Sequence, residues 1–145
     1  MEPLIEHLIE TFLTRGGKVF IAPQYSITAI DNDHEWSCPD FVALDFENRE
    51  VVVIEVTSGA NIGPITRKAK DREKQWFTPL RHKLKSHGIA DGWSLRFLGF
   101  VRRESIEKAR SAMAGHDSVS FFPIEDAAFP WKYWDSRINN GLPKS

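Results

Sequence analysis

The sequence has very little cysteine, and this limits both its redox chemistry and its metal chemistry. Cys38 is the single cysteine among 145 residues. The chain can therefore form no internal disulfide and no zinc site built from several cysteines. Its five histidines show no spacing typical of metal ligands. A chain that needs no disulfide suits a reducing compartment, so we expect a cytoplasmic protein.

Long apolar runs and several common catalytic motifs are also missing. No run approaches the roughly 18 apolar residues of a membrane helix, so we expect no membrane contact. The first residues, MEPLIEHLIETFLTRGG, mix acids with apolar residues and lack the basic start of a signal peptide. The glycine-containing stretch SGANIG (58–63) lacks the Lys-Ser/Thr ending of a P-loop, and no Gly-x-Ser-x-Gly occurs. These absences argue against a membrane protein, a P-loop NTPase and an α/β-hydrolase.

Aromatic residues are plentiful, and the positive charge is concentrated in one stretch. Five Trp and ten Phe argue against disorder, and 145 residues suit one domain, 1–145, with a real core. The net charge is −1, but residues 66–87 hold eight Lys or Arg and two acids. That segment carries +6, so the rest of the chain carries −7. A basic stripe on an acidic body suits contact with a polyanion, and a solvated helix face is the alternative.

Hydrophobic periodicity predicts alternating helices and strands. The expected helices cover 3–15, 64–77, 104–115 and 125–141, the last one short and rich in aromatic residues. Thr78-Pro79 either kinks the second helix or begins another that ends near Gly88. The expected strands cover 18–23, 39–46, 51–57, 93–102 and 118–124, with 24–30 as a continuation or partner of the first. This order predicts an α/β fold with an α-β-β-β-α-β core, a C-terminal α-β-α extension and one mixed sheet flanked by helices.

Two acidic residues stand where neighbouring strands would bring them together. Asp40 begins one expected strand and Glu55 lies near the end of the next. If the two strands form a hairpin about Glu47–Glu50, both carboxylates reach one point. Glu55 lies among β-branched residues, where a buried charge needs a partner. A metal ion is one such partner, and a basic side chain from a helix is the other.

This arrangement resembles the PD-(D/E)XK nuclease superfamily, which has a restriction-endonuclease-like fold. The resemblance rests on Glu6 in the first helix, Pro39-Asp40, and Glu-Val-Thr at 55–57, and it spans about residues 3–102. It implies that Asp40, Glu55 and the backbone carbonyl of Val56 bind Mg²⁺ or Mn²⁺. It also implies that Glu6 is an upstream acid that touches the metal through water.

The sequence departs from that family at Thr57, where its members usually carry a lysine. Threonine is uncharged and cannot stabilise a developing phosphoryl charge as an ammonium does. In some members the lysine comes from the next helix, and Lys68 and Lys70 are the candidates here, with Lys68 preferred. Both lysines could instead be solvated, and the site could instead have lost its chemistry. The other residues expected at the nucleic acid are Arg67, Arg72, Lys74 and Gln75.

The sequence therefore predicts a metal-dependent nuclease that hydrolyses phosphodiester bonds, with DNA favoured over RNA. The alternative is a catalytically inactive subunit of the same fold that binds nucleic acid or a protein partner. A nuclease of this size often needs a second copy or a larger complex to cut two strands, so a homodimer or a larger assembly is expected. The position of the positive charge near Glu55 separates the two functions.

Overall fold

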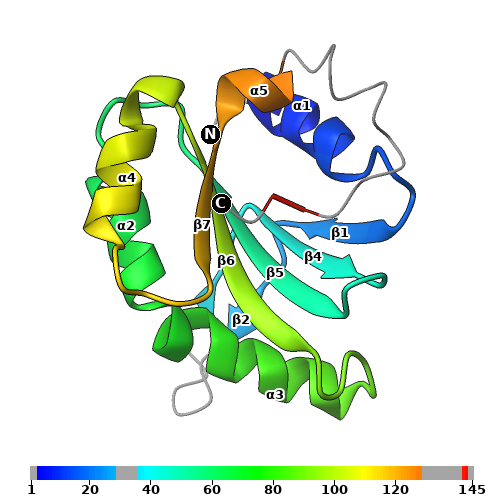
Figure 1. Cartoon of the computed structure of the whole chain (residues 1–145). Helices are drawn as coiled ribbons and strands as arrows, with labels where there is room; N and C mark the ends of the chain where they lie inside the picture. Colours follow the sequence, from blue (N-terminus) through cyan, green and yellow to red (C-terminus); the bar gives the residue numbers. More distant parts are fainter. Residues whose placement is uncertain (1–2, 29–35, 129–141, 144–145) are drawn as a thin grey trace.

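The structure is a computed structural model that describes residues 3–28, 36–128 and 142–143. Within these residues a five-stranded sheet lies at the centre, and helices cover both of its faces (Figure 1). Its strands in spatial order are β1 (Val19–Pro23), β4 (Phe41–Asp45), β5 (Glu50–Val56), β6 (Ser94–Val101) and β7 (Val119–Pro123). Neighbours are antiparallel from β1 to β5 and parallel from β5 to β7. The predicted α/β fold with a mixed sheet is confirmed.

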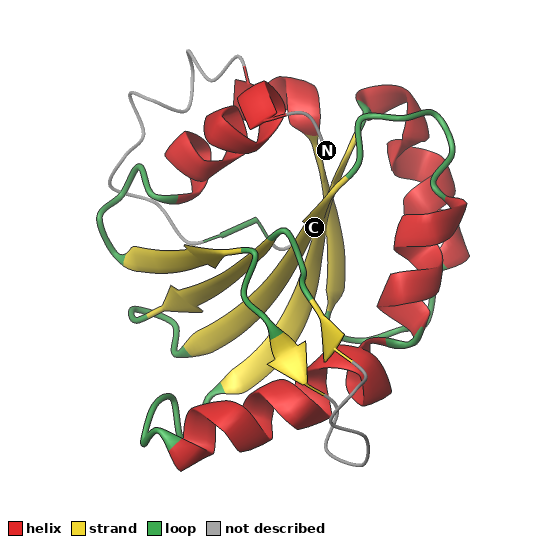
Figure 2. Ribbon diagram, turned by 180° about the vertical axis from the view of Figure 1, so that it is seen from behind, coloured by secondary structure: helices red, strands yellow, loops and turns green. Residues whose placement is uncertain are grey.

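The helices divide between the two faces of the sheet, as the view from behind shows (Figure 2). One face is covered by α1 (Pro3–Leu13) and α5 (Ile124–Ala128). The other is covered by α2 (Gly63–Lys70), α3 (Thr78–Ser86) and α4 (Ile106–Ala112). Gly17 follows α1 with a φ of 71°, the left-handed conformation expected after a helix.

Strand β5 is central, and it is buried on both faces as its run of β-branched residues predicts. Because side chains alternate along a strand, Val51 and Val53 pack toward α2 and α3, whereas Val52 and Ile54 pack toward α1. The same alternation places Glu55 on the face covered by α2. This charged residue is only 5% exposed, so it must find its partner on that side.

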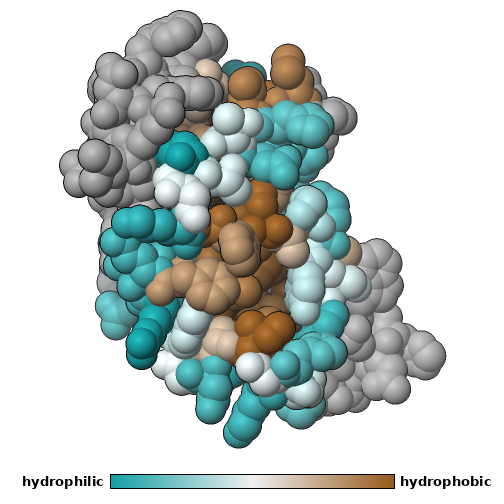
Figure 3. Space-filling model, turned by 90° about the vertical axis from the view of Figure 1, so that its right-hand side faces the viewer, coloured by the Kyte–Doolittle hydropathy of each residue, from teal (hydrophilic) through white to brown (hydrophobic). Residues whose placement is uncertain are grey.

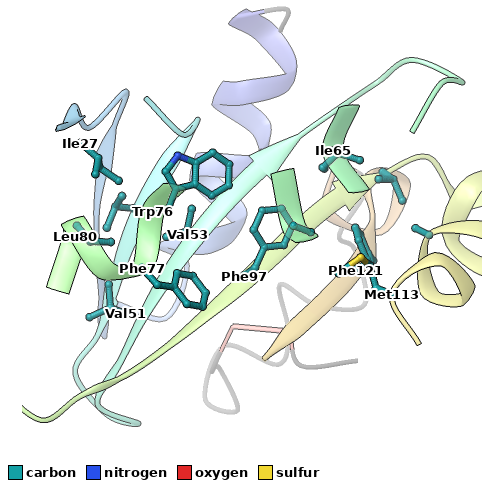
Figure 4. Close-up of a cluster of buried hydrophobic side chains, with 14 of the residues drawn as sticks. Ile27, Val51, Val53, Ile65, Trp76, Phe77, Leu80, Phe97, Met113 and Phe121 are labelled. Atoms are coloured by element: carbon teal, nitrogen blue, oxygen red, sulfur yellow. The ribbon is translucent and has the colours of Figure 1, made fainter. Parts of the chain in front are cut away.

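Aromatic side chains fill the core between the sheet and α2 and α3 (Figure 4). Trp76 stacks on Phe97 with ring centroids 5.9 Å apart, and both are fully buried. The indole Nε1–H of Trp76 donates to Ser37 Oγ at 2.6 Å, which satisfies the polar atom of this large ring. Ser37 belongs to the short strand β3 (Trp36–Ser37), so this bond ties the segment before Asp40 to the helical layer.

The predicted break at Thr78-Pro79 takes the form of a π-helical turn. Glu73–Phe77 forms one π-helical segment, and α3 begins directly after it with Pro79 in its first turn. Proline has no N–H to donate to a residue one α-helical turn earlier, so the preceding backbone adopts wider hydrogen bonding. The helix predicted at 64–77 thus ends at Lys70 with a turn at Asp71, and the π-helical segment leads directly into α3.

Several predicted boundaries differ from the observed ones. The strand predicted at 24–30 is β2 (Ile27–Thr28) within the described residues, and it pairs with β3 (Trp36–Ser37) in a separate two-stranded sheet and not with β1. No strand was predicted at β3. The helix predicted at 104–115 begins with a 3₁₀ turn (Arg103–Ser105). The predicted C-terminal helix is α5 at 124–128, and 129–141 lies outside the described residues.

The side of the molecule that carries β1 and α1 has an apolar area bordered by hydrophilic side chains (Figure 3). Phe20 and Phe46 are the exposed aromatic residues of the described chain, at 66% and 50% exposed. They contact each other edge to face, and Phe46 also contacts Trp93. Among the described helices, none is long and apolar enough to cross a membrane.

A second set of buried charges holds the opposite end of the β4–β5 hairpin. Arg96 on β6 donates to Glu50 Oε2 at 3.1 Å and to the carbonyls of Leu142 and Pro143 at 3.1 and 2.7 Å. Asp45 accepts hydrogen bonds from the turn that follows it. Burial lowers the pKa of Arg96, and the carboxylate of Glu50 opposes that effect. These charges stabilise a turn and a chain end, and they are separate from the site described next.

Candidate functional site

The hairpin register places Asp40 opposite Glu55, as the sequence predicts. Phe41 pairs with Ile54, and Asp40 and Glu55 are the next residues along the two chains. The backbone N–H of Asp40 donates to Glu55 Oε2 at 3.3 Å. The backbone N–H of Val56 donates to Asp40 Oδ2 at 2.8 Å. Each carboxylate is therefore held by the other residue's strand, and the two acids are fixed side by side.

Lys68 supplies a positive charge to this acid pair from α2. Its Nζ lies 2.8 Å from Glu55 Oε1. The Glu55 side chain is 7% exposed and the Lys68 side chain is 45% exposed, so the ion pair closes the solvent side of the site. Lys70 lies two residues further along the helix, about 200° around its axis. It is exposed, which makes Lys68 the lysine that approaches the acids.

Gly99 on β6 allows α2 to lie this close to the sheet, and the sequence analysis did not identify it. Gly99 is the register partner of Glu55. A Cβ at this position would lie 2.7 Å from ring carbons of Phe121 and 3.2 Å from Cδ1 of Ile65 on α2. Any larger residue would push these side chains outward and carry α2 with them. A glycine inside the strand predicted at 93–102 was the available signal, because glycine within a strand marks a close approach.

Burial and a neighbouring carboxylate control the charge of Glu55. Burial first, and then the hydrogen bond and negative charge of Asp40, raise its pKa from 4.5 to about 7. Lys68 acts in the opposite direction, since its ammonium favours the ionised form. Near neutral pH this carboxyl therefore exists in both protonation states, and any cation that binds here will favour the ionised one.

Glu6 lies beside this pair, on the side of Asp40. Burial first, and then the charge of Asp40 and a hydrogen bond with it, raise the pKa of Glu6. The residue projects from the first part of α1, and it is half-buried. The structure thus brings Glu6, Asp40, Glu55 and Lys68 to one place, and of the five side chains predicted as catalytic, all within the described residues, only Lys70 has no contact with this group.

Thr57 follows directly after β5, at the position where a lysine was expected. It is half-buried, and its backbone N–H donates to the carbonyl of Phe100 at 2.9 Å. That bond continues the β5–β6 ladder past Val56 and keeps the backbone beside the acids extended. Thr57 supplies no charge, and the nearby ammonium is that of Lys68.

The remaining predicted residues fall into two groups. Arg67 and Lys70 at the end of α2 and Lys74 in the π-helical segment are exposed, and their basic groups are accessible from solvent. Arg72 is half-buried, and its guanidinium donates to the carbonyls of Ala69 and Asp117 at 2.7 and 2.8 Å. It therefore fastens the helical layer to the loop before β7.

Gln75 also has a partner inside the protein. Its Nε2 donates to Ser37 Oγ at 3.3 Å, next to the stronger bond from Trp76. The amide is on the exposed side of this contact. Gln75 thus lies at the border between the helical layer and the loop that leads to Asp40.

The donor atoms of this site suit a hard divalent cation. Among the described residues, no three His, Cys, Asp or Glu side chains are grouped to hold a metal ion. Two carboxylates are enough for Mg²⁺, which keeps several waters and takes only one or two protein carboxylates. In this structure the ammonium of Lys68 neutralises Glu55, the carboxylate that a metal ion would also bind. The carboxylates of Asp40 and Glu55 are oxygen donors of the kind that Mg²⁺ and Mn²⁺ prefer.

The site's geometry is the basis for assigning a function to this chain. No protein-family model matches the sequence, and no curated protein gives a significant match. A function for this chain therefore has to be inferred from its fold and from the side chains of Glu6, Asp40, Glu55 and Lys68.

Proposed function

We propose that this protein is a metal-dependent nuclease that hydrolyses phosphodiester bonds at Asp40 and Glu55. The observation that carries the proposal is the contact of Lys68 Nζ with Glu55 Oε1 at 2.8 Å. A lysine amine beside a pair of acids is the combination that phosphodiester hydrolysis needs, and Thr57 cannot provide it. The fold is consistent with the resemblance to PD-(D/E)XK nucleases, which supplies the reaction type.

Each residue then has a defined task. Asp40, Glu55 and the carbonyl of Val56 hold Mg²⁺ or Mn²⁺, and Glu6 orients a water next to Asp40. The bound ion would supply Lewis-acid stabilisation of the phosphoryl oxygens. Lys68 places its ammonium where negative charge develops on the phosphate. Burial of Glu55 strengthens these interactions, because charges act more strongly away from bulk water.

The exposed basic residues beside the site give the substrate a place to bind. Arg67 and Lys70 on α2 and Lys74 on the π-helical segment are exposed basic residues of the helical layer that also carries Lys68. Such side chains contact phosphates without reading sequence, and their contribution falls as salt rises. The resemblance favours DNA over RNA. Cutting both strands of a duplex needs two sites, so we include a homodimer or a larger complex in the proposal.

A second function is favoured by one observation. In this structure the Lys68 ammonium is already paired with Glu55, and Thr57 adds no other charge. A chain that keeps this ion pair while it binds nucleic acid or a protein partner would be a catalytically inactive subunit. The two functions differ in whether bound nucleic acid is cut.

A cleavage assay separates them. The full chain is incubated with single-stranded, duplex and branched DNA and with RNA, in Mg²⁺, Mn²⁺ or a chelator. Asp40→Asn and Glu55→Gln preserve shape and remove charge, and Glu107→Gln on the exposed side of α4 is the control. We expect metal-dependent cleavage that both site variants lose and the control keeps. Cleavage that survives in both site variants contradicts the proposal, and binding without cleavage supports the inactive subunit.

A further inference from the structure

The ion pair between Lys68 and Glu55 has one fixed member and one movable member. Glu55 lies on the central strand, it is buried, and its Oε2 accepts a hydrogen bond from the backbone of Asp40. Lys68 reaches it from α2 through a flexible four-carbon side chain that is 45% exposed. The lysine can therefore move its ammonium into water by rotating its side chain, whereas Glu55 cannot leave the site.

The lysine and a metal ion require the same carboxylate. Lys68 Nζ contacts Oε1 of Glu55, and the other oxygen, Oε2, accepts the backbone N–H of Asp40. A metal ion between Asp40 and Glu55 would bind the same carboxylate that the lysine contacts. A divalent cation held between Asp40 and Glu55 would repel an ammonium at 2.8 Å from one of its ligands. The two cations would repel each other across one carboxylate, so each should weaken the binding of the other to Glu55.

We propose that Lys68 acts as a built-in competitor for the metal, an internal cation that occupies Glu55 until a divalent ion displaces it. This inference rests on the proposed function, since it concerns the same site. The displaced ammonium remains tethered to α2 beside the acids, which is where a phosphate would meet it. Lys68 thus sets the metal concentration at which the site fills, and filling the site releases the charge that the substrate needs.

The first test measures metal affinity without nucleic acid. Mn²⁺ is titrated into the full-length wild type, Lys68→Met and Lys70→Met, and free Mn²⁺ is measured by electron paramagnetic resonance. Lys70→Met removes the same charge from the same helix but not from Glu55. Because the pKa of Glu55 is about 7 and rises further without Lys68, the titration is done at about pH 8.5 to limit competition by protons. We expect Lys68→Met to bind Mn²⁺ about fivefold more tightly than Lys70→Met, as for loss of an ion pair worth about 1 kcal/mol.

The second test uses the unmodified protein, so it does not depend on a variant that folds. Lysine amines are acetylated briefly with acetic anhydride, with and without saturating Mg²⁺, and each lysine is quantified by mass spectrometry. We expect Mg²⁺ to increase labelling of Lys68 at least threefold, roughly the change expected when an amine leaves a weak ion pair. Labelling of Lys70 should stay the same.

The outcomes distinguish this inference from the proposed function. Tighter Mn²⁺ binding by Lys68→Met together with increased Lys68 labelling supports competition. Equal or weaker binding relative to Lys70→Met, or unchanged labelling of Lys68 in saturating Mg²⁺, overturns the inference and leaves the metal site intact. Absence of Mn²⁺ binding in all three proteins overturns both the inference and the metal-dependent function.

Discussion

Replacing Glu55 by glutamine should stabilise the protein at high pH, although it removes a residue of the proposed site. Glutamine has nearly the same shape as protonated glutamate, and it stays neutral at every pH. Glu55 carries a charge in a place that is 5% exposed, so its ionised form is held at a cost in free energy. The expected gain can be worked out from the pKa.

The size of the effect follows from the difference between the folded and unfolded states. The pKa rises from 4.5 to about 7, and one unit corresponds to about 1.4 kcal/mol, so the difference is about 3 kcal/mol. Between pH 4.5 and 7 the folded chain keeps a proton that the unfolded chain releases, so the stability of the wild type falls as pH rises. The contribution of Lys68 is included, because it already acts on this pKa.

Urea unfolding at a series of pH values tests the prediction. The free energy of unfolding of Glu55→Gln minus that of the wild type should be near zero at about pH 4 and reach about 3 kcal/mol at about pH 8. Glu107→Gln, at an exposed position on α4, should show no such trend. A difference that does not change with pH, or a wild type that is more stable than Glu55→Gln at about pH 8, would refute the reasoning.

Three further predictions concern the same site. Binding of Mn²⁺ near pH 6 should release close to one proton from Glu55 and almost none near pH 9, which calorimetry in two buffers of different ionisation enthalpy measures. Thr57→Lys should change the free energy of unfolding by less than about 1 kcal/mol, since Thr57 is half-buried, and it should increase cleavage; a variant that unfolds would show that Thr57 is packed in the core. Gly99→Ala should lower the free energy of unfolding by about 1–3 kcal/mol because its Cβ would meet Phe121, and a thermal melt showing no loss would contradict the role given to this glycine.

The acid pair could be predicted from sequence because it depends on local features. A β-branched run bounded by a turn predicts a hairpin, and the hairpin register alone places Asp40 opposite Glu55. The alternation of side chains then determines which face Glu55 takes. These properties need no knowledge of how distant elements pack.

The choice between Lys68 and Lys70 needed the structure to settle it. Both are exposed residues of α2, about 200° apart around its axis, and which of them approaches Glu55 depends on the rotation of the helix against β6. That rotation is set by contacts far apart in the sequence, among them Ile65 and Phe121 around Gly99. The contact of the Arg72 guanidinium with the carbonyl of Asp117 depends on tertiary packing that no local pattern encodes. The same holds for the pairing of β2 with β3.

We expect the parts of the site to form at different times during folding. Asp40 and Glu55 belong to one hairpin, and a hairpin forms within about 1–10 μs, whereas Lys68 arrives only when α2 docks on the parallel half of the sheet. Docking of α2 buries Glu55 and brings the Lys68 ammonium to it in the same step. The free-energy cost of burying the ionised Glu55 therefore arises late in folding. A substitution that removes this penalty should therefore slow unfolding and leave the folding rate nearly unchanged. The hairpin and α2 thus divide the site into a part that forms early and a part that controls how long the folded protein lasts.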